Sequence, residues 1–246
     1  MLERIIFKDE EDSSFIKLFV EIFIIFLLLC FLNILLGGNY LFLVAITSIS
    51  IAYPVVKYIR RQNHLELIDE NINHSLNYFN RQMLVGWVIF VAATLAFLLT
   101  FTLLRDFTFH EMIVSQITGN ITGNISFMDI LLNNLYVGFL TFLVAFISTS
   151  GIIFILVWNA SVLAYVLAQA STFSQTSIMF LHFISHGLLE IGGYILIGLA
   201  ASILSYRIER YKRYNKFASK HLLKQFFLLL MLGLGLILIA AIVEVI

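Results

Sequence analysis

The chain contains little charge: only 12% of its 246 residues are Asp, Glu, Lys or Arg, whereas 61% are hydrophobic. A soluble domain of this size carries about twice that charged fraction, and it could not hide so much apolar surface. The sequence also lacks the alternating ten-residue strands of a membrane barrel. Its single cysteine, Cys30, excludes an intrachain disulfide. The composition therefore predicts an all-α fold, a polytopic transmembrane bundle.

Recognisable catalytic motifs are also missing. The sequence has no Gly-rich phosphate loop, no His-Glu-x-x-His, no Gly-x-Ser-x-Gly and no pair of cysteines. We therefore expect a protein that is not an enzyme, with no cofactor and no resident metal. Residues 1–14 are polar and acidic, unlike the basic start of a signal peptide, so we expect the first hydrophobic span to be retained as an anchor.

Long apolar runs fill the rest of the chain, and a helix needs about 20 such residues to cross a bilayer. We predict about seven spans, at residues 15–36, 40–58, 83–104, 130–147, 152–170, 178–206 and 226–246. The break between the fourth and fifth spans is placed at 148–151, with Trp158-Asn159 as an alternative position. The sixth span is longer than one crossing needs, which predicts a kink or a partly re-entrant segment near Gly192-Gly193.

Basic residues support this count of spans. Of the 15 Lys and Arg residues, all but Arg105 cluster near the start of the first span, between the second and third spans, or between the sixth and seventh spans, which seven crossings place on one side. By the positive-inside rule, the N-terminus is predicted to be cytoplasmic and the C-terminus outside. The domain organisation expected is a tail and transmembrane hairpin at 1–58, a cytoplasmic amphipathic segment at 59–82, and a transmembrane bundle at 83–246. The localisation that follows is the cell membrane, in a multi-pass arrangement.

Polar side chains inside the apolar spans are candidates for function. Within hydrocarbon such groups must face the bundle interior or a wet cavity, because lipid offers no hydrogen-bonding partner. His182, His186 and Glu190 recur every fourth position and form one stripe on a helix. We predict a buried polar core made of Asn133, Asn134, Asn159, His186, Gly187 and Glu190, with His182, Tyr165 and Gln169 as accessory residues.

Three interpretations of this stripe stay open. The first is a structural clasp, in which Glu190 accepts from His186 and an Asn on a neighbouring span completes the network. The second is a proton or solute pathway in which His186 and Glu190 titrate as a pair. The third is a metal site, which would need ligands from elsewhere because the stripe diverges over about 12 Å along a straight helix.

A basic and aromatic segment follows the sixth span. It contains Arg207, Arg210, Lys212 and Arg213 among several tyrosines. Beside a membrane span this composition favours contact with anionic lipid headgroups over nucleic acid. The partners expected are the lipid bilayer, its anionic headgroups, other membrane or envelope proteins, and further copies of the chain, but no nucleic acid.

Three short motifs resemble the pattern of the stage II sporulation protein M family. They are Asn133-Asn134-Leu-Tyr-Val, Trp158-Asn159 and Ser185-His186-Gly187-Leu-Leu-Glu190, and the resemblance covers residues 83–207. Ser185 stands where the family usually has Pro, and Ala160 where it has Gly. In sporulating bacteria the family is linked to membrane migration during engulfment, as a scaffold for cell-wall hydrolases.

The resemblance implies a helical bundle with a polar core more firmly than it implies a reaction. We therefore expect a non-catalytic integral membrane protein that scaffolds membrane or envelope complexes. A transporter or channel with a buried His-Glu site is the first alternative. A metal-dependent intramembrane hydrolase is the second.

Overall fold

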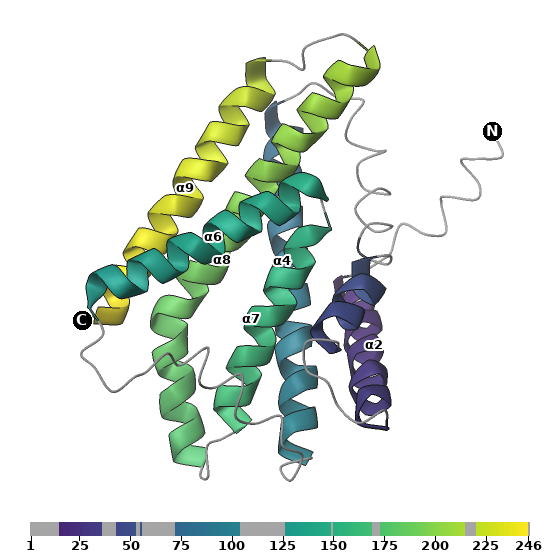
Figure 1. Cartoon of the computed structure of the whole chain (residues 1–246), viewed down its shortest axis with the longest axis vertical. Helices are drawn as coiled ribbons and strands as arrows, with labels where there is room; N and C mark the ends of the chain where they lie inside the picture. Colours follow the sequence, from purple (N-terminus) through teal and green to yellow (C-terminus); the bar gives the residue numbers. More distant parts are fainter. Residues whose placement is uncertain are drawn as a thin grey trace, which may run out of the picture.

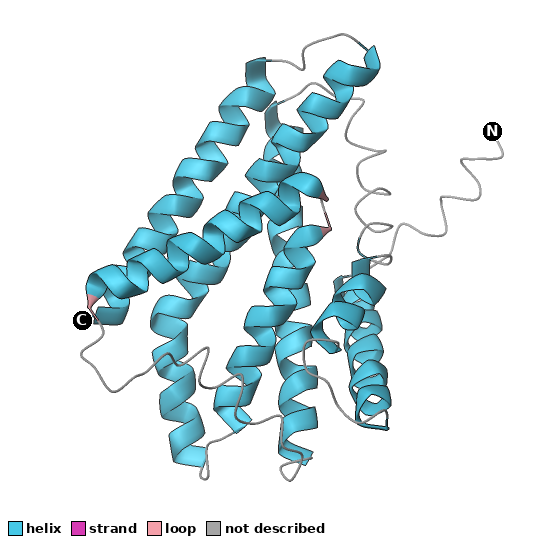
Figure 2. Cartoon of the chain, in the orientation of Figure 1, coloured by secondary structure: helices cyan, strands magenta, loops and turns pink. Residues whose placement is uncertain are grey.

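The computed structural model describes residues 15–35, 43–52, 55, 72–103, 126–148, 150–168, 173–214 and 220–245. Within these ranges the regular structure is entirely helical (Figures 1 and 2). The elements in chain order are α2 (Phe15–Leu35), a short helix (Leu43–Ala52), α4 (Ile72–Leu103), α6 (Phe127–Ile147), α7 (Gly151–Ala168), α8 (Phe173–Tyr214) and α9 (Lys220–Val245). The predicted all-α class is therefore confirmed.

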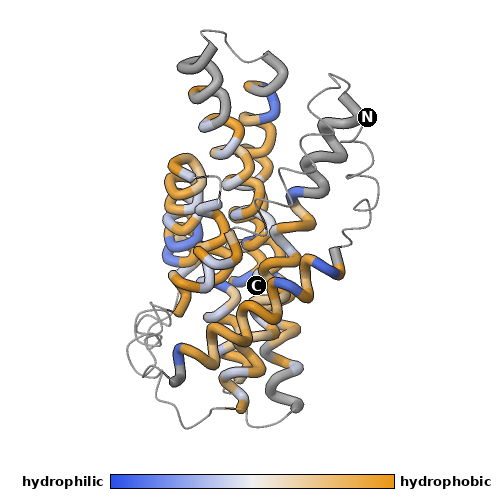
Figure 3. The backbone as a smooth tube through the Cα atoms, turned by 90° about the vertical axis from the view of Figure 1, so that its right-hand side faces the viewer, coloured by the Kyte–Doolittle hydropathy of each residue, from blue (hydrophilic) through white to orange (hydrophobic). Residues whose placement is uncertain are grey.

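Six of these helices are long and apolar enough to cross a membrane. The qualifying stretches are Ile16–Asn33, Gln82–Leu103, Phe127–Ile147, Gly151–Ala168, Phe183–Ser205 and Leu223–Val245. Figure 3 shows the hydrophobic colouring that extends along most of their length. The predicted span at 40–58 corresponds to the shorter apolar helix Leu43–Ala52, and most of the other residues in that range lie outside the described residues. The polytopic bundle that the composition predicts is thus present.

Two helices are longer and more continuous than the sequence pattern suggested. α4 begins at Ile72 and runs without interruption into its apolar stretch, so residues 72–82 of the expected cytoplasmic segment form its first turns. α8 is one helix through Gly192-Gly193, so the partly re-entrant segment expected there is absent. The side chains of Leu236 and Trp87 lie next to Gly192. Their packing stabilises the helical backbone at this glycine pair.

The turn between α6 and α7 lies where the Ser-Thr-Ser-Gly cluster predicted it. α6 ends at Ile147 with Ser148 as its C-cap, and the Gly151 amide donates to the Ser148 carbonyl oxygen at 2.7 Å. A Cβ atom at Gly151 would collide with the carbonyl oxygen of Val144, so this tight connection requires glycine. The alternative break at Trp158-Asn159 lies inside α7 and is wrong.

α8 is the central helix of the bundle. All residues from 191 to 198 are buried, and α8 packs against α9, α6, α7 and α4. α4 pairs with α7 and also carries α2 on its other side. α6 crosses obliquely over α7, α8 and α9, and it starts beside the C-terminal end of α9 (Figure 1). This crossing sets polar residues of α6 against the middle of α8.

Candidate functional site

A side-chain hydrogen bond joins α6 to α8. The Asn134 amide donates through Nδ2 to Oε1 of Glu190, which lies 56 positions later in the chain. Asn134 is only 5% exposed, and Glu190 is partly buried. A hydrogen bond between an amide and an ionisable group in a membrane bundle satisfies two groups that lipid cannot serve. This contact is the predicted interior link between an Asn and the Glu of the stripe.

The two residues lie at a similar depth. Glu190 is about 10 Å along the axis of α8 from Phe183, where its span begins, and Asn134 is about 10 Å along α6 from Phe127. The hydrogen-bonded pair therefore lies about two helical turns into each apolar stretch.

Asn133 does not share the burial of Asn134. Its side chain is exposed on α6, and its Nδ2 donates to Oδ1 of Asn134 at 3.4 Å. Adjacent helical residues point about 100° apart, so only one of two consecutive amides can face α8. The expectation that both amides belong to a buried core is therefore corrected: Asn134 is in the core, whereas Asn133 touches it from the outer face of α6.

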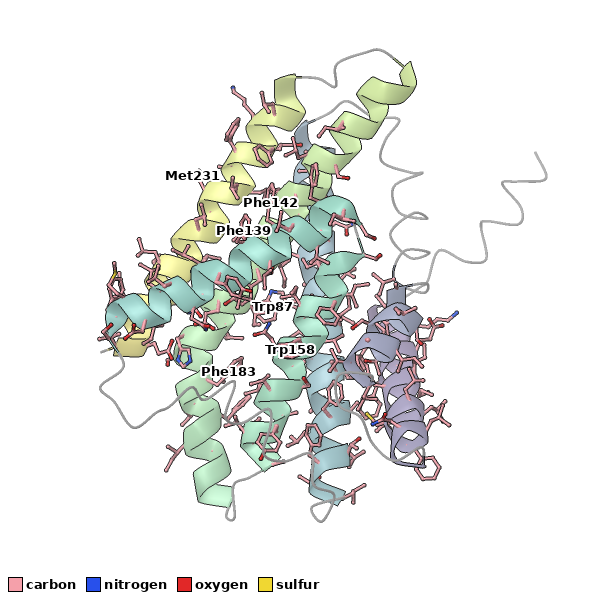
Figure 4. All side chains as sticks on the ribbon, in the orientation of Figure 1. Trp87, Phe139, Phe142, Trp158, Phe183 and Met231 are labelled. Carbon is pink, nitrogen blue, oxygen red and sulfur yellow. The ribbon has the colours of Figure 1, made fainter. Side chains whose placement is uncertain are left out.

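His186 and Gly187 lie on α8 one turn before Glu190. His186 is partly buried, its ring centroid lies 6.3 Å from that of Phe183, and its Nδ1 lies 3.5 Å from Oγ of Ser185. Gly187 is buried, and a Cβ atom there would overlap the Phe183 ring. The absence of a side chain at Gly187 thus makes room for Phe183, which Figure 4 labels on the lower half of α8.

Asn159 and Tyr165 belong to a different part of the bundle. Asn159 donates from Nδ2 to the carbonyl oxygen of Ile155 in its own helix, α7, at 2.8 Å. Tyr165 packs edge-on against Phe101 of α4, with ring centroids 6.0 Å apart. The hydrogen bond seen for Asn159 is therefore internal to α7, and Tyr165 faces the α4 side of that helix.

The remaining predicted residues lie partly or wholly outside the described residues. Gln169 follows the end of α7, and it is not described. The backbone of His182 lies in α8, as do those of Arg207, Arg210, Lys212 and Arg213, but the side chains of these five residues are not described. Their predicted roles stay predictions.

Two further residues join the site. Tyr194 is 2% exposed and lies one helical turn after Glu190, and Glu244 is partly buried in the last turn of α9. Glu244 lies close enough to Glu190 and Tyr194 for an electrostatic interaction with both. Signals for both existed in the sequence: Tyr194 continues the four-residue stripe, and Glu244 is the one acidic residue in the last apolar run.

Beyond this site α8 and α9 are in close contact and apolar. Gly193 lies against Gly233, with Ile237 and Ile197 beside them. The Trp87 ring from α4 lies near Gly192, and Figure 4 labels it beneath the oblique α6. Thr141 and Ser202 donate to carbonyl oxygens of their own helices. The crossing of the two glycines is thus lined by apolar side chains.

Ligands for a metal are not assembled in the part of the chain that the structure describes. No group of three or more His, Cys, Asp or Glu side chains there could hold an ion. In the site described above, Glu190 and Glu244 supply two carboxylates, which is fewer ligands than a zinc ion needs. A catalytic zinc site has three protein ligands.

A comparison with protein families identifies the chain. A family model described as Stage II sporulation protein M matches residues 40–246, which extends beyond the segment 83–207 that carries the motifs. No curated protein and no solved structure matches the chain. α2 precedes the matched region, whereas Asn134, Glu190 and Glu244 all lie inside it. Because the match covers most of the residues, the chain belongs to the stage II sporulation protein M family, as a multi-pass membrane protein.

Proposed function

We propose that the protein is a non-catalytic scaffold of the cell membrane, which holds membrane or envelope proteins in a fixed arrangement. The observation that carries this proposal is the hydrogen bond from Asn134 to Glu190, because it fixes the oblique α6 against the central helix. A bundle held in this way presents a constant outer surface to partners. Family membership supports the same kind of role, since the sporulation members of the family are linked to scaffolding.

The distribution of polar groups favours a structural role over passage of a solute. A pathway through the bundle needs polar or hydrated groups along its whole length. Here the polar residues Asn134, Glu190 and Glu244 form one cluster, and the Gly193–Gly233 contact with its isoleucines lies next to it. This apolar contact beside the polar cluster favours a structural role.

One observation favours a second candidate, a transporter coupled to protons or cations. Glu190 and Glu244 come from different helices, and their charges interact. Carboxylates that share a site inside a membrane protein are typical of proton relays. In this function Glu190 would bind and release the transported proton or cation, and Glu244 would be the neighbouring acidic residue from α9.

Reconstitution of the purified protein separates the two candidates. The Glu190→Gln variant keeps the size of the side chain and removes its charge. For a scaffold, proteoliposomes of both wild type and variant show no proton or cation flux above empty vesicles, and the variant unfolds at a lower temperature. Photo-crosslinking in native membranes should then yield adducts with envelope proteins. Flux that Glu190→Gln abolishes, with unchanged thermal stability, would overturn the scaffold proposal in favour of transport.

A further inference from the structure

The outer face of α6 carries a polar group that lipid cannot satisfy. α6 is the least buried of the six spans, with 22% of its residues buried. One face of the helix is formed by large apolar side chains spaced three or four positions apart, namely Leu132, Tyr136, Phe139, Leu143 and Ile147. Asn133 is exposed beside Leu132 and Tyr136. We call these six residues the α6 face.

Asn133 is about 9 Å along the helix axis from Phe127, where the span begins. Its one hydrogen bond among the described residues is the donation to Asn134 at 3.4 Å, which is long for a hydrogen bond. An amide has two N–H donors and an oxygen with two lone pairs, so the Asn133 oxygen and its second N–H remain available on the surface. In hydrocarbon such groups favour a partner helix over lipid.

We propose that the α6 face is the contact through which two copies of this chain associate in the membrane. A side-chain amide is self-complementary, because it both donates and accepts. In a two-fold symmetric pair each residue of the interface meets the same surface on the other copy. Asn133 of one copy then donates to Asn133 of the other and accepts from it, which completes the hydrogen bonding that a single copy leaves open.

The other exposed faces of the bundle lack this property. The outward residues in the middle of α9, such as Met231 and Leu238, are apolar and suit lipid (Figure 4). On α2 the exposed polar residues Lys17 and Glu21 lie at the start of the span, from which their side chains can reach the interface. Across the described spans, Asn133 is the exposed side-chain amide.

The contact also extends the interior site. Asn133 donates to Asn134, and Asn134 donates to Glu190, so one chain of hydrogen bonds connects the α6 face with the buried carboxylate. Successive hydrogen bonds polarise one another and strengthen as a chain. Association of two copies would therefore reinforce the link between α6 and α8. The inference stands apart from the scaffold role, since a transporter could pair in the same way.

Cysteine crosslinking tests the location of the contact. In a Cys30→Ala background, single cysteines replace Tyr136 or Phe139 on the α6 face, and Met231 or Leu238 on α9 as matched controls. In liposomes of the full-length protein, oxidation should give disulfide-linked pairs from the α6 positions and not from the α9 positions. Pairs from α9 alone, or none at any position, would overturn the proposal.

Measuring association in a bilayer tests the role of Asn133. Fluorescence transfer between labelled copies is followed as the lipid-to-protein ratio rises. Asn133→Leu should lower the association constant roughly 3- to 30-fold, the range expected for hydrogen bonds between membrane helices. Asn133→Gln keeps the amide and should restore most of the affinity, and Met231→Leu should change nothing.

Thermal unfolding of each variant in detergent shows whether the monomer is intact. If Asn133→Leu folds like wild type and pairs as tightly, the proposal fails. It also fails if the wild type remains monomeric at every dilution, or if crosslinks in native membranes join the α6 face only to a different protein.

Discussion

Gly193 of α8 and Gly233 of α9 lie so close together that a Cβ atom on either residue would be 2.9 Å from the carbonyl oxygen of the other. Real Cβ atoms do not approach a backbone oxygen to that distance, so the two helices can cross here only because both positions lack side chains. Small residues at such crossings let transmembrane backbones pack closely. The polar site lies next to this crossing, since Glu190 and Tyr194 flank Gly193 on α8.

Substituting either glycine should loosen the α8–α9 crossing. We expect Gly193→Ala and Gly233→Ala each to lower the free energy of unfolding by about 1–3 kcal/mol, the usual cost of overpacking a core. Gly235→Ala is the matched control, because nothing lies within 4 Å of a Cβ atom there. Unfolding in mixed micelles, followed by circular dichroism, measures the three values. Equal stability of Gly193→Ala and Gly235→Ala would contradict the close crossing.

The hydrogen bond between Asn134 and Glu190 should be measurable as a coupling energy. Asn134→Leu removes the donor and leaves a buried carboxyl group without it, which costs about 1–3 kcal/mol. In a Glu190→Leu background the same change should cost less, by about 0.6–2 kcal/mol. The four unfolding free energies of the double-mutant cycle give this difference.

Asn159→Leu supplies the control for that cycle. Asn159 donates to Ile155 within its own helix, so its replacement should add to Glu190→Leu within about 0.5 kcal/mol. A coupling near zero between positions 134 and 190 would show that the clasp contributes nothing to folding. Coupling of a similar size at position 159 would instead show that the effect is not specific to the α6–α8 link.

The only cysteine of the chain reports on how α2 is held. Cys30 is 1% exposed, and Phe26 one turn earlier packs edge-on against Phe97 of α4, with ring centroids 5.4 Å apart. Phe26→Ala removes this contact, and large-to-small changes of a buried Phe cost about 3–5 kcal/mol. We expect a membrane-permeant thiol reagent to label Cys30 at least about 10-fold faster in this variant, since each 1.4 kcal/mol is a factor of ten.

Phe31→Ala is the comparison for α2, because Phe31 is 64% exposed on the opposite side of the helix. Its labelling rate should stay within about two-fold of wild type, as expected for a surface substitution. If both variants label Cys30 at the wild-type rate, α2 is not held through Phe26.

The orientation predicted from basic residues can be tested at the two ends of α9. In a Cys30→Ala background, Val245→Cys should react with an impermeant maleimide in intact cells. Lys220→Cys should react only after the membrane is permeabilised. The reason is that the positive-inside rule predicts a cytoplasmic position for the basic residues around Lys220. The reverse labelling pattern would invert the orientation, and labelling of both positions from outside would show that α9 does not cross the membrane.

Local features of the sequence were enough to predict most of the helices. The apolar stretches of α2, α6, α7 and α9 match the predicted spans closely, because the length and composition of a run decide whether it can cross a bilayer. The turn at Ser148 was predictable for the same reason, since short polar side chains and Gly151 stop a helix locally. The helical continuity of α8 was missed, because glycine alone does not break a helix that its neighbours support.

The sequence by itself determined that the chain folds as a membrane bundle and that Glu190 has to find a polar partner, since both follow from the cost of exposing polar groups to hydrocarbon. Only the tertiary structure decided that the partner is Asn134, that Asn133 lies on the outer face, and that Glu244 approaches from the far end of the chain. These outcomes depend on how α6 and α9 cross α8. A crossing is set by the packing of residues far apart in the sequence, such as Gly193 against Gly233 and Asn134 against Glu190, which no local pattern records.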